Sequence, residues 1–232
     1  MPEELTRRQA LLDVALVLAL TVAGVVAAAA IGHVLQARLA LPQLLVLSLQ
    51  GVFVLAGVQL LLLWRKQSWR GLGLLPPRPL DALRGLLAVG CIFALNALLS
   101  MLAAHFVPAP VEAHQQRLID FAEMLTSGLP FGGVAATMLF VGFYEEMVAR
   151  GFLLTRCRTL VGGSVGPVLL SSLLFGLGHA YQGWVGVLQT MLVGVVLATL
   201  TLRWGTLWPA IFAHAMLNTL SLGVLRELGS AT

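Results

Sequence analysis

Ionisable side chains within apolar stretches are the residues of this chain best suited to chemistry. Glu145, Glu146 and Arg150 lie within one apolar stretch, and His179 lies near the end of the next. An ionisable group at the centre of a membrane helix costs about 2.5–3.5 kcal/mol on insertion scales, and such groups usually mark function. Glu146 and Arg150 are four residues apart, so on a helix they share a face and can pair. Glu145 then points about 100° away, which leaves one carboxylate free beside a neutralised neighbour.

A second polar pair lies near the end of the chain. His214 and Asn218 are also four residues apart, so the imidazole and the amide share a helix face and both can donate hydrogen bonds. Taken alone, each motif has a simpler explanation: interfacial carboxylates at a helix end for the glutamates, and hydrogen bonds between packed helices for the histidines. Three such motifs in one small bundle argue against coincidence.

Other polar residues in the apolar stretches are expected to be structural rather than chemical. Four are isolated: Asp13, His33, Asn96 and Gln189. Two histidines are expected to be solvated in or beside an outer loop: His105 and His114.

The composition requires a membrane to surround these residues. The chain has 232 residues, of which 59% are hydrophobic and 10% charged, whereas a soluble domain carries roughly a quarter charged residues. Too few polar side chains are present to cover a water-facing surface. This excludes soluble, disordered, collagen-like and nucleic-acid-binding proteins, and the net charge of +4 falls in short loops.

Seven apolar stretches are long enough, or nearly so, to cross a bilayer at about 20 residues each. They are Leu- and Ala-rich without period-2 alternation, which indicates helices rather than a barrel. The predicted fold is therefore all-α: residues 1–232 form a single integral membrane domain, a polytopic bundle of about seven (six to eight) transmembrane helices. The first stretch is too long for a signal peptide and is expected to be a retained helix. The spans are predicted near residues 10–33, 41–64, 84–107, 129–154, 165–182, 184–202 and 206–226.

Basic residues predict the orientation, because Lys and Arg are enriched in cytoplasmic loops. With the N-terminus in the cytoplasm, the inner segments carry ten of them and the outer segments three, with Arg150 at a helix end. This predicts a multi-pass protein of the cell (inner, cytoplasmic) membrane. The ten inner residues are Arg7, Arg8, Arg65, Lys66, Arg70, Arg78, Arg84, Arg156, Arg158 and Arg203, and the three outer ones are Arg38, Arg117 and Arg226.

One amphipathic stretch, residues 111–126, lies between the third and fourth spans. Its apolar residues interleave with charged ones, so it either lies flat in the outer interface as a helix or is a polar loop with one helical turn.

The ordered motifs resemble those of the CPBP family, the CAAX proteases and bacteriocin-processing enzymes of the Abi group. The resemblance rests on Glu145-Glu146-x-x-x-Arg150-Gly-Phe-Leu, Phe175-x-x-x-His179 and His214-x-x-x-Asn218, and its strong part covers residues 139–220. Members of this family are intramembrane endopeptidases related to the Ras-converting protease. The resemblance therefore implies a hydrolase whose catalytic core is residues 139–220.

The resemblance also implies a role for each motif residue. Glu145 and His179 would hold and activate the attacking water, and His214 and Asn218 would donate hydrogen bonds to the oxyanion. Glu146, paired with Arg150, would hold in place the helix that carries these charged residues.

Metal dependence remains open at this point. The resemblance favours a metal-independent enzyme without a cofactor. The alternative is zinc, with Glu145, His179 and His214 as its three protein ligands.

Depth sets one condition on this site. From the span ends chosen above, Glu145 and His214 lie about 12 Å deep and His179 about 21 Å deep. We therefore expect the fourth span to continue to about residue 158, with the site in a polar cavity that opens to the cytoplasm.

The expected substrate is a membrane-bound, lipidated or precursor peptide, within the lipid bilayer and without nucleic acid. Two alternatives from other classes are a catalytically silent peptide-binding or immunity membrane protein and a small proton-coupled transporter.

Overall fold

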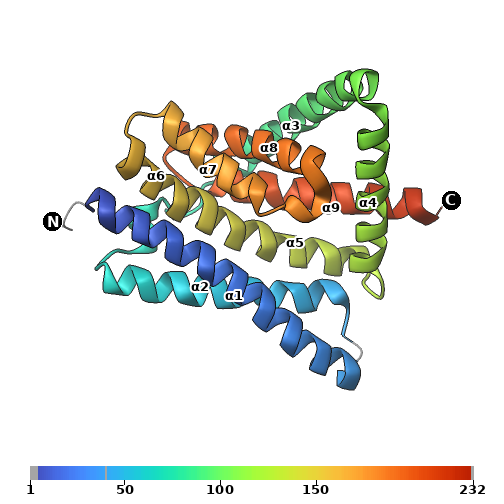
Figure 1. Cartoon of the computed structure of the whole chain (residues 1–232), viewed down its shortest axis with the longest axis horizontal. Coiled ribbons are helices and arrows are strands. Elements are labelled where there is room, and N and C mark those ends of the chain that lie inside the picture. The colour runs from blue at the N-terminus through green and yellow to red at the C-terminus, as the bar shows by residue number, and fades with distance from the viewer. Residues whose placement is uncertain (1–4, 40, 231–232) are drawn as a thin grey trace.

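The computed structural model describes residues 5–39 and 41–230, and within them every regular element is helical. The predicted all-α polytopic bundle is confirmed (Figure 1). In chain order the elements are α1 (Arg7–Leu39), α2 (Gln43–Trp64), η1 (Trp69–Leu72), α3 (Pro79–Phe106), α4 (Pro108–Thr126), α5 (Phe131–Glu146), η2 (Met147–Leu153), α6 (Leu154–Val161), α7 (Val165–Leu177), η3 (Ala180–Gln182), α8 (Gly183–Trp204) and α9 (Trp208–Ser230).

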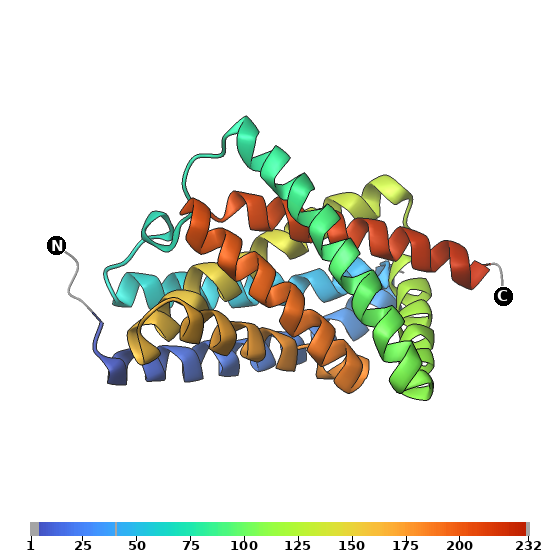
Figure 2. The same cartoon turned by 90° about the horizontal axis from the view of Figure 1, so that it is seen from above.

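Within the described residues, six segments are long and apolar enough to cross a membrane: α1, α2, α3, residues 131–161, residues 180–204 and α9. The remaining predicted span, the fifth at residues 165–182, is shorter than expected. Its helix α7 has 13 residues and is about 20 Å long, because the chain leaves the helix at Gly178 and turns through η3. If α7 is counted with the six longer segments, the chain makes seven passes. An odd number of passes agrees with the positions of the two ends of the described chain, which lie at opposite ends of the bundle (Figures 1 and 2).

The fourth span is longer than its apolar core, as the depth condition requires. It runs through α5, the π-helical segment η2 and α6 to Val161, so the expected continuation to about residue 158 is confirmed. The path from Glu145 to Val161 is about 24 Å long, and that from Val165 to His179 about 21 Å. The two residues therefore lie at similar depths, counted from the turn that joins the helices.

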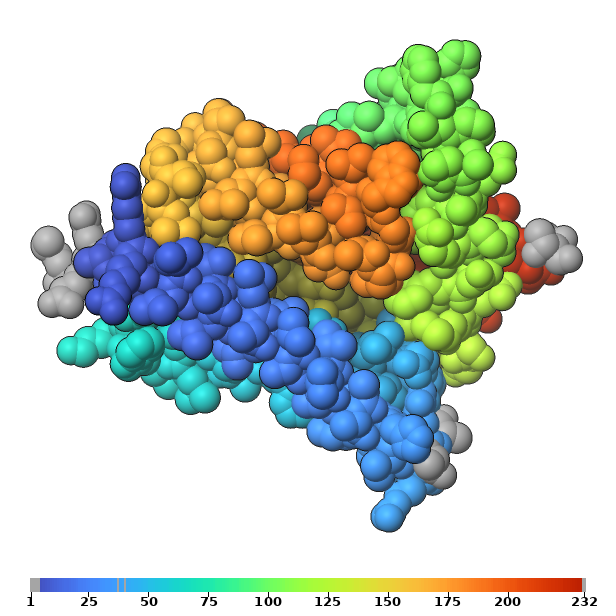
Figure 3. All heavy atoms as spheres, in the orientation of Figure 1, coloured from blue at the N-terminus to red at the C-terminus, as the bar shows by residue number. Residues whose placement is uncertain are grey.

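The fourth span is the centre of the bundle, with α2 and α9 packed against α5 and with α1 and α7 against α6. In Figure 3 its middle part is visible as a strip between α1 and the α7–α8 pair. Helices α5 and α9 approach closely at Gly142, where a side-chain carbon would lie 2.9 Å from the backbone nitrogen of Ala215. This glycine therefore allows the glutamates of the fourth span to approach His214.

The amphipathic stretch is a 19-residue helix, α4, and not a polar loop. It runs across the ends of the other helices in Figure 1, as expected of an interfacial helix. The expectation of a solvated His114 is wrong: His114 is buried, with Nδ1 3.2 Å from the carbonyl oxygen of Gln182 and Nε2 2.9 Å from Oε1 of Gln189. His105 is exposed, as expected.

Candidate active site

Glu146 is the buried centre of the polar cluster. Its Oε1 accepts a hydrogen bond from Nη1 of Arg150 at 2.6 Å and lies 2.7 Å from Nδ1 of His214. All three side chains are nearly inaccessible to solvent. The i,i+4 pair expected from the sequence is thus present, and Glu146 also bridges the fourth span to α9.

Glu145 lies on the more open side of the same helix. Its Oε1 accepts a hydrogen bond from the hydroxyl of Tyr144 at 3.1 Å, and its Oε2 lies 3.6 Å from Nε2 of His214. Its side chain is 19% exposed, whereas that of Glu146 is fully buried. At 3.6 Å two atoms are too far apart for a direct hydrogen bond, but they can share one water molecule.

Tyr144 occupies space that a glycine leaves open. A side-chain carbon at Gly51 of α2 would lie 2.4 Å from the Tyr144 ring, so a larger residue there would displace the ring. Packing between α2 and α5 therefore holds the tyrosine that orients Glu145.

His179 follows the C-terminus of α7, and its Nδ1 lies 3.0 Å from the carbonyl oxygen of Phe175. Because a carbonyl only accepts, Nδ1 carries the hydrogen and Nε2 of the neutral ring is left as an acceptor.

The ring of Phe175 joins His179 to the other motifs. Its centroid lies 4.9 Å from that of His179 and 5.9 Å from that of His214. The Arg150 guanidinium lies over the same ring at 4.3 Å, a favourable cation–π geometry. One residue of each motif, Arg150, His179 and His214, therefore lies beside this ring.

Asn218 lies one helical turn beyond His214 on α9 and is half-buried. Within the described residues no hydrogen bond joins it to the glutamates or to either histidine of the cluster. Its amide is therefore not engaged by the residues that surround Glu146.

A π-helical segment follows the glutamates directly. Met147–Leu153 has the wider i→i+5 pattern and contains Arg150. Such segments are rare and frequently occur at functional sites.

Unpaired polar atoms are concentrated in this cluster. Of seven buried side-chain nitrogen and oxygen atoms without a hydrogen-bond partner among the described residues, three belong here: Oε2 of Glu145, Oε2 of Glu146 and Nη2 of Arg150. Buried polar atoms are normally paired, so an unpaired group in a native fold points to a bound water, ion or substrate.

The residues present do not form a ready zinc site. Both histidines have Nδ1 bonded and Nε2 free, as zinc ligands often do. Across residues 5–39 and 41–230, however, no three His, Cys, Asp or Glu side chains lie close enough together to hold a metal ion.

Two contributors to this geometry were missed in the sequence. Tyr144 lies directly before the first quoted motif and Phe175 begins the second, but neither was given a role. The signal for Tyr144 was its place directly before the glutamates, and that for Phe175 was its place one helical turn before His179.

Comparison with known proteins agrees with the motifs. Residues 127–220 match the family model described as type II CAAX prenyl endopeptidase Rce1-like. No curated protein and no solved structure matched the chain. The matched segment contains α5, η2, α6, α7 and α8 and most of α9, and therefore every residue of the cluster. The match supports an intramembrane endopeptidase, and hence a hydrolase. The resemblance drawn from the three motifs is thereby confirmed, and residues 127–220 of this multi-pass membrane protein match the Rce1-like CAAX protease family.

Proposed function

We propose that the protein cleaves a membrane-associated peptide, lipidated or precursor, by direct attack of an activated water on the scissile carbonyl. The observation that carries this proposal is the free Oε2 of Glu145, which faces His214 inside a cluster of unpaired polar atoms. A buried carboxylate oxygen without a partner can accept a hydrogen bond from a water molecule.

In the proposed mechanism, Glu145 and His179 hold the water and take its proton as its oxygen attacks the carbonyl carbon. The free Nε2 of His179 is an acceptor suited to this step. His179 then returns the proton from Nε2 to the leaving amine.

His214 and Asn218 donate hydrogen bonds to the oxyanion of the tetrahedral intermediate. Because Nδ1 of His214 faces Glu146, a donor at Nε2 requires the imidazolium form. With that form the formal charges of Glu145, Glu146, Arg150 and His214 sum to zero. Donors of this kind typically contribute 10²–10³-fold each, an order-of-magnitude estimate.

No step of this mechanism passes through a metal. Glu146 and Arg150 act as a support, since they fix His214 and the π-helical segment. The site lies within a helical bundle that fits a lipid bilayer, and we propose that the site opens to the cytoplasm with the N-terminus on the same side.

The test is proteolysis by the full chain in liposomes, with two peptide sets: membrane-anchored peptides with a prenylated cysteine near the C-terminus, and unlipidated membrane precursors. We expect cleavage by the wild type, loss in Glu145→Ala and in His179→Ala, and no change in Glu227→Ala, an exposed glutamate on α9. The peptide set that is cleaved identifies the substrate class.

A chelator arm tests the absence of a metal. We expect activity to survive exhaustive chelation. Loss that only zinc restores would overturn the metal-independent mechanism, and binding of peptides without cleavage by folded protein would overturn the enzymatic one.

A further inference from the structure

A cavity of about 730 Å³ lies at the end of the bundle where α1 begins. Residues from the start of α1, the turn after α2 and the end of the fourth span line it, and no residue of the candidate active site is among them. Its volume lies within the 300–1,000 Å³ range of small-molecule sites.

The described lining of this cavity is basic. Lys66, Arg156 and Arg158 line it together with the polar side chains of Gln67 and Ser68, and none of the described lining residues is acidic. Lys66 and Arg158 are exposed, and neither side chain makes a hydrogen bond or ion pair with another described residue. The two cations are therefore available to a ligand.

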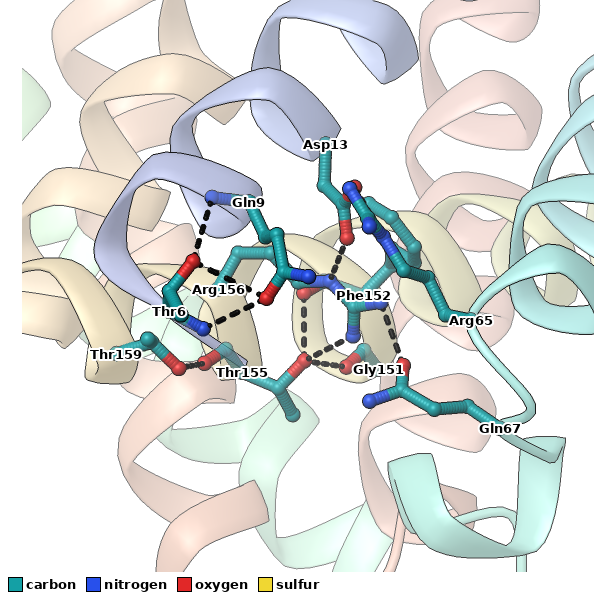
Figure 4. A network of polar contacts seen from close by, with 10 residues as sticks. All are labelled: Thr6, Gln9, Asp13, Arg65, Gln67, Gly151, Phe152, Thr155, Arg156 and Thr159. Atoms are coloured by element: carbon teal, nitrogen blue, oxygen red, sulfur yellow. Dashed lines mark hydrogen bonds and ion pairs between the residues drawn. The ribbon is translucent and has the colours of Figure 1, made fainter. Parts of the chain in front are cut away.

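A network of hydrogen bonds and ion pairs centred on Arg156 forms part of the cavity wall (Figure 4). Arg156 is 1% exposed and uses Nε on Asp13 at 3.2 Å, Nη2 on Oε1 of Gln67 at 2.6 Å and Nη1 on the Thr155 hydroxyl at 3.2 Å. Asp13 is the only acidic side chain in this network, and Arg65 also donates to it at 2.7 Å. One carboxylate thus faces two guanidinium groups, so the network retains a positive charge.

Lys66 has a backbone conformation that favours glycine. Its φ of 53° is the only positive value at a non-glycine residue in the described chain. The N–H of Gln67 bonds to the carbonyl of Leu62 and that of Lys66 to the carbonyl of Leu63, the Schellman pattern that ends α2. Glycine is the usual residue at this position, so lysine here adopts a strained backbone conformation.

From these observations we infer that the cavity between α1, the turn after α2 and α6 binds an anionic phosphate group. Lys66 and Arg158 would supply the charges, and Ser68, whose Oγ accepts from Gly71 N–H, keeps its own hydrogen to donate. Arginine and lysine are the usual partners of phosphate.

Two sources can supply that group, a phospholipid headgroup or free phosphate. The cavity adjoins the start of α1 and the end of α2, both candidate membrane spans, so it lies at the level expected for headgroups. Its volume also exceeds that of a phosphate ion, which favours the lipid.

The experiment measures both sources on the full chain, which includes Glu3 and Glu4 outside the described residues. In the first assay, the protein is released from phosphatidylcholine nanodiscs that also contain phosphatidylglycerol, and native mass spectrometry counts the phosphatidylglycerol molecules that stay bound. In the second assay, inorganic phosphate is titrated into the detergent-solubilised protein and binding is measured by calorimetry. We expect saturable binding of phosphatidylglycerol to the wild type, and a roughly tenfold loss of affinity for each charge removed in Lys66→Gln and Arg158→Gln. Saturable binding of free phosphate, with the same losses, would support the site and name the soluble source.

Two further variants keep the inference falsifiable. Arg70→Gln removes an exposed charge at the same end that does not line the cavity and should leave binding unchanged. Lys66→Gly should lose binding while the protein melts at the same or a higher temperature, because glycine relieves the positive φ. No saturable binding of either probe, or an equal loss in Arg70→Gln, would overturn the inference.

Discussion

Two buried ion clusters lie along the fourth span, and they differ in how completely their polar atoms are paired. Around Asp13, both carboxylate oxygens accept from arginine and every nitrogen of the Arg156 guanidinium has a partner. Around Glu146, three buried polar atoms have none. The polar atoms of the first cluster are paired without a ligand, whereas the unpaired atoms of the second are available to the water and substrate of the proposed mechanism. The two clusters are both buried and charged, and they differ in this pairing.

The comparison predicts opposite effects of removing a carboxylate from the two clusters. Glu145→Gln should lower proteolysis by about 10²–10⁴-fold, because it removes an acceptor for the water proton. Thermal stability should hardly change, since Oε2 of Glu145 makes no hydrogen bond. Peptidase rates and melting temperatures of the variant and of Glu227→Gln measure both effects. A collapse of stability would show that Glu145 is structural and would contradict the distinction.

Asp13→Ala should show the reverse pattern. It leaves Arg65 and the buried Arg156 without their shared carboxylate, at a cost of about 3–5 kcal/mol in the free energy of unfolding. Denaturation in mild detergent measures this loss, with Asp120→Ala at an exposed position as control. Protein that remains folded should retain its rate per active molecule, and full activity loss without loss of stability would contradict the structural role.

Asn218→Ala tests whether the reactive cluster extends along α9. We expect proteolysis to fall by about 10²–10³-fold with KM nearly unchanged, as for the loss of an oxyanion donor. Asn96→Ala removes the same side chain from α3, outside the site, and should have no effect on the rate. A change confined to KM would assign Asn218 to substrate binding instead.

Tyr144→Phe should have the smallest effect, roughly tenfold in rate, because it removes one hydrogen bond to Glu145. In a Glu145→Gln background the same change should have almost no further effect, since the two residues act as one unit. Additive losses in the double variant would mean that Tyr144 acts independently of Glu145.

The local parts of this site could be predicted from the sequence. The Glu146–Arg150 pair follows from i,i+4 spacing, and the extension of the fourth span follows from the requirement that the motifs meet at one depth. Contacts between distant segments could not be predicted. His114 is buried because it meets Gln182 and Gln189, which are 68 and 75 residues away in the chain. The π-helical segment leaves no signal in the periodicity of so short a stretch.

The π-helical segment also sets the rotational phase of the fourth span. Each α-helical residue advances by about 100° around the axis, and a π segment absorbs an extra residue without carrying that rotation forward. The half that bears Glu146 and the half that bears Arg156 can therefore face different neighbours, α9 in one case and α1 in the other. The segment therefore allows the two halves of the fourth span to take rotational positions that are independent of each other. A one-residue deletion within Met147–Leu153 could thus be absorbed by a return to the α-helical pattern, whereas the same deletion in α5 would rotate both glutamates away from His214.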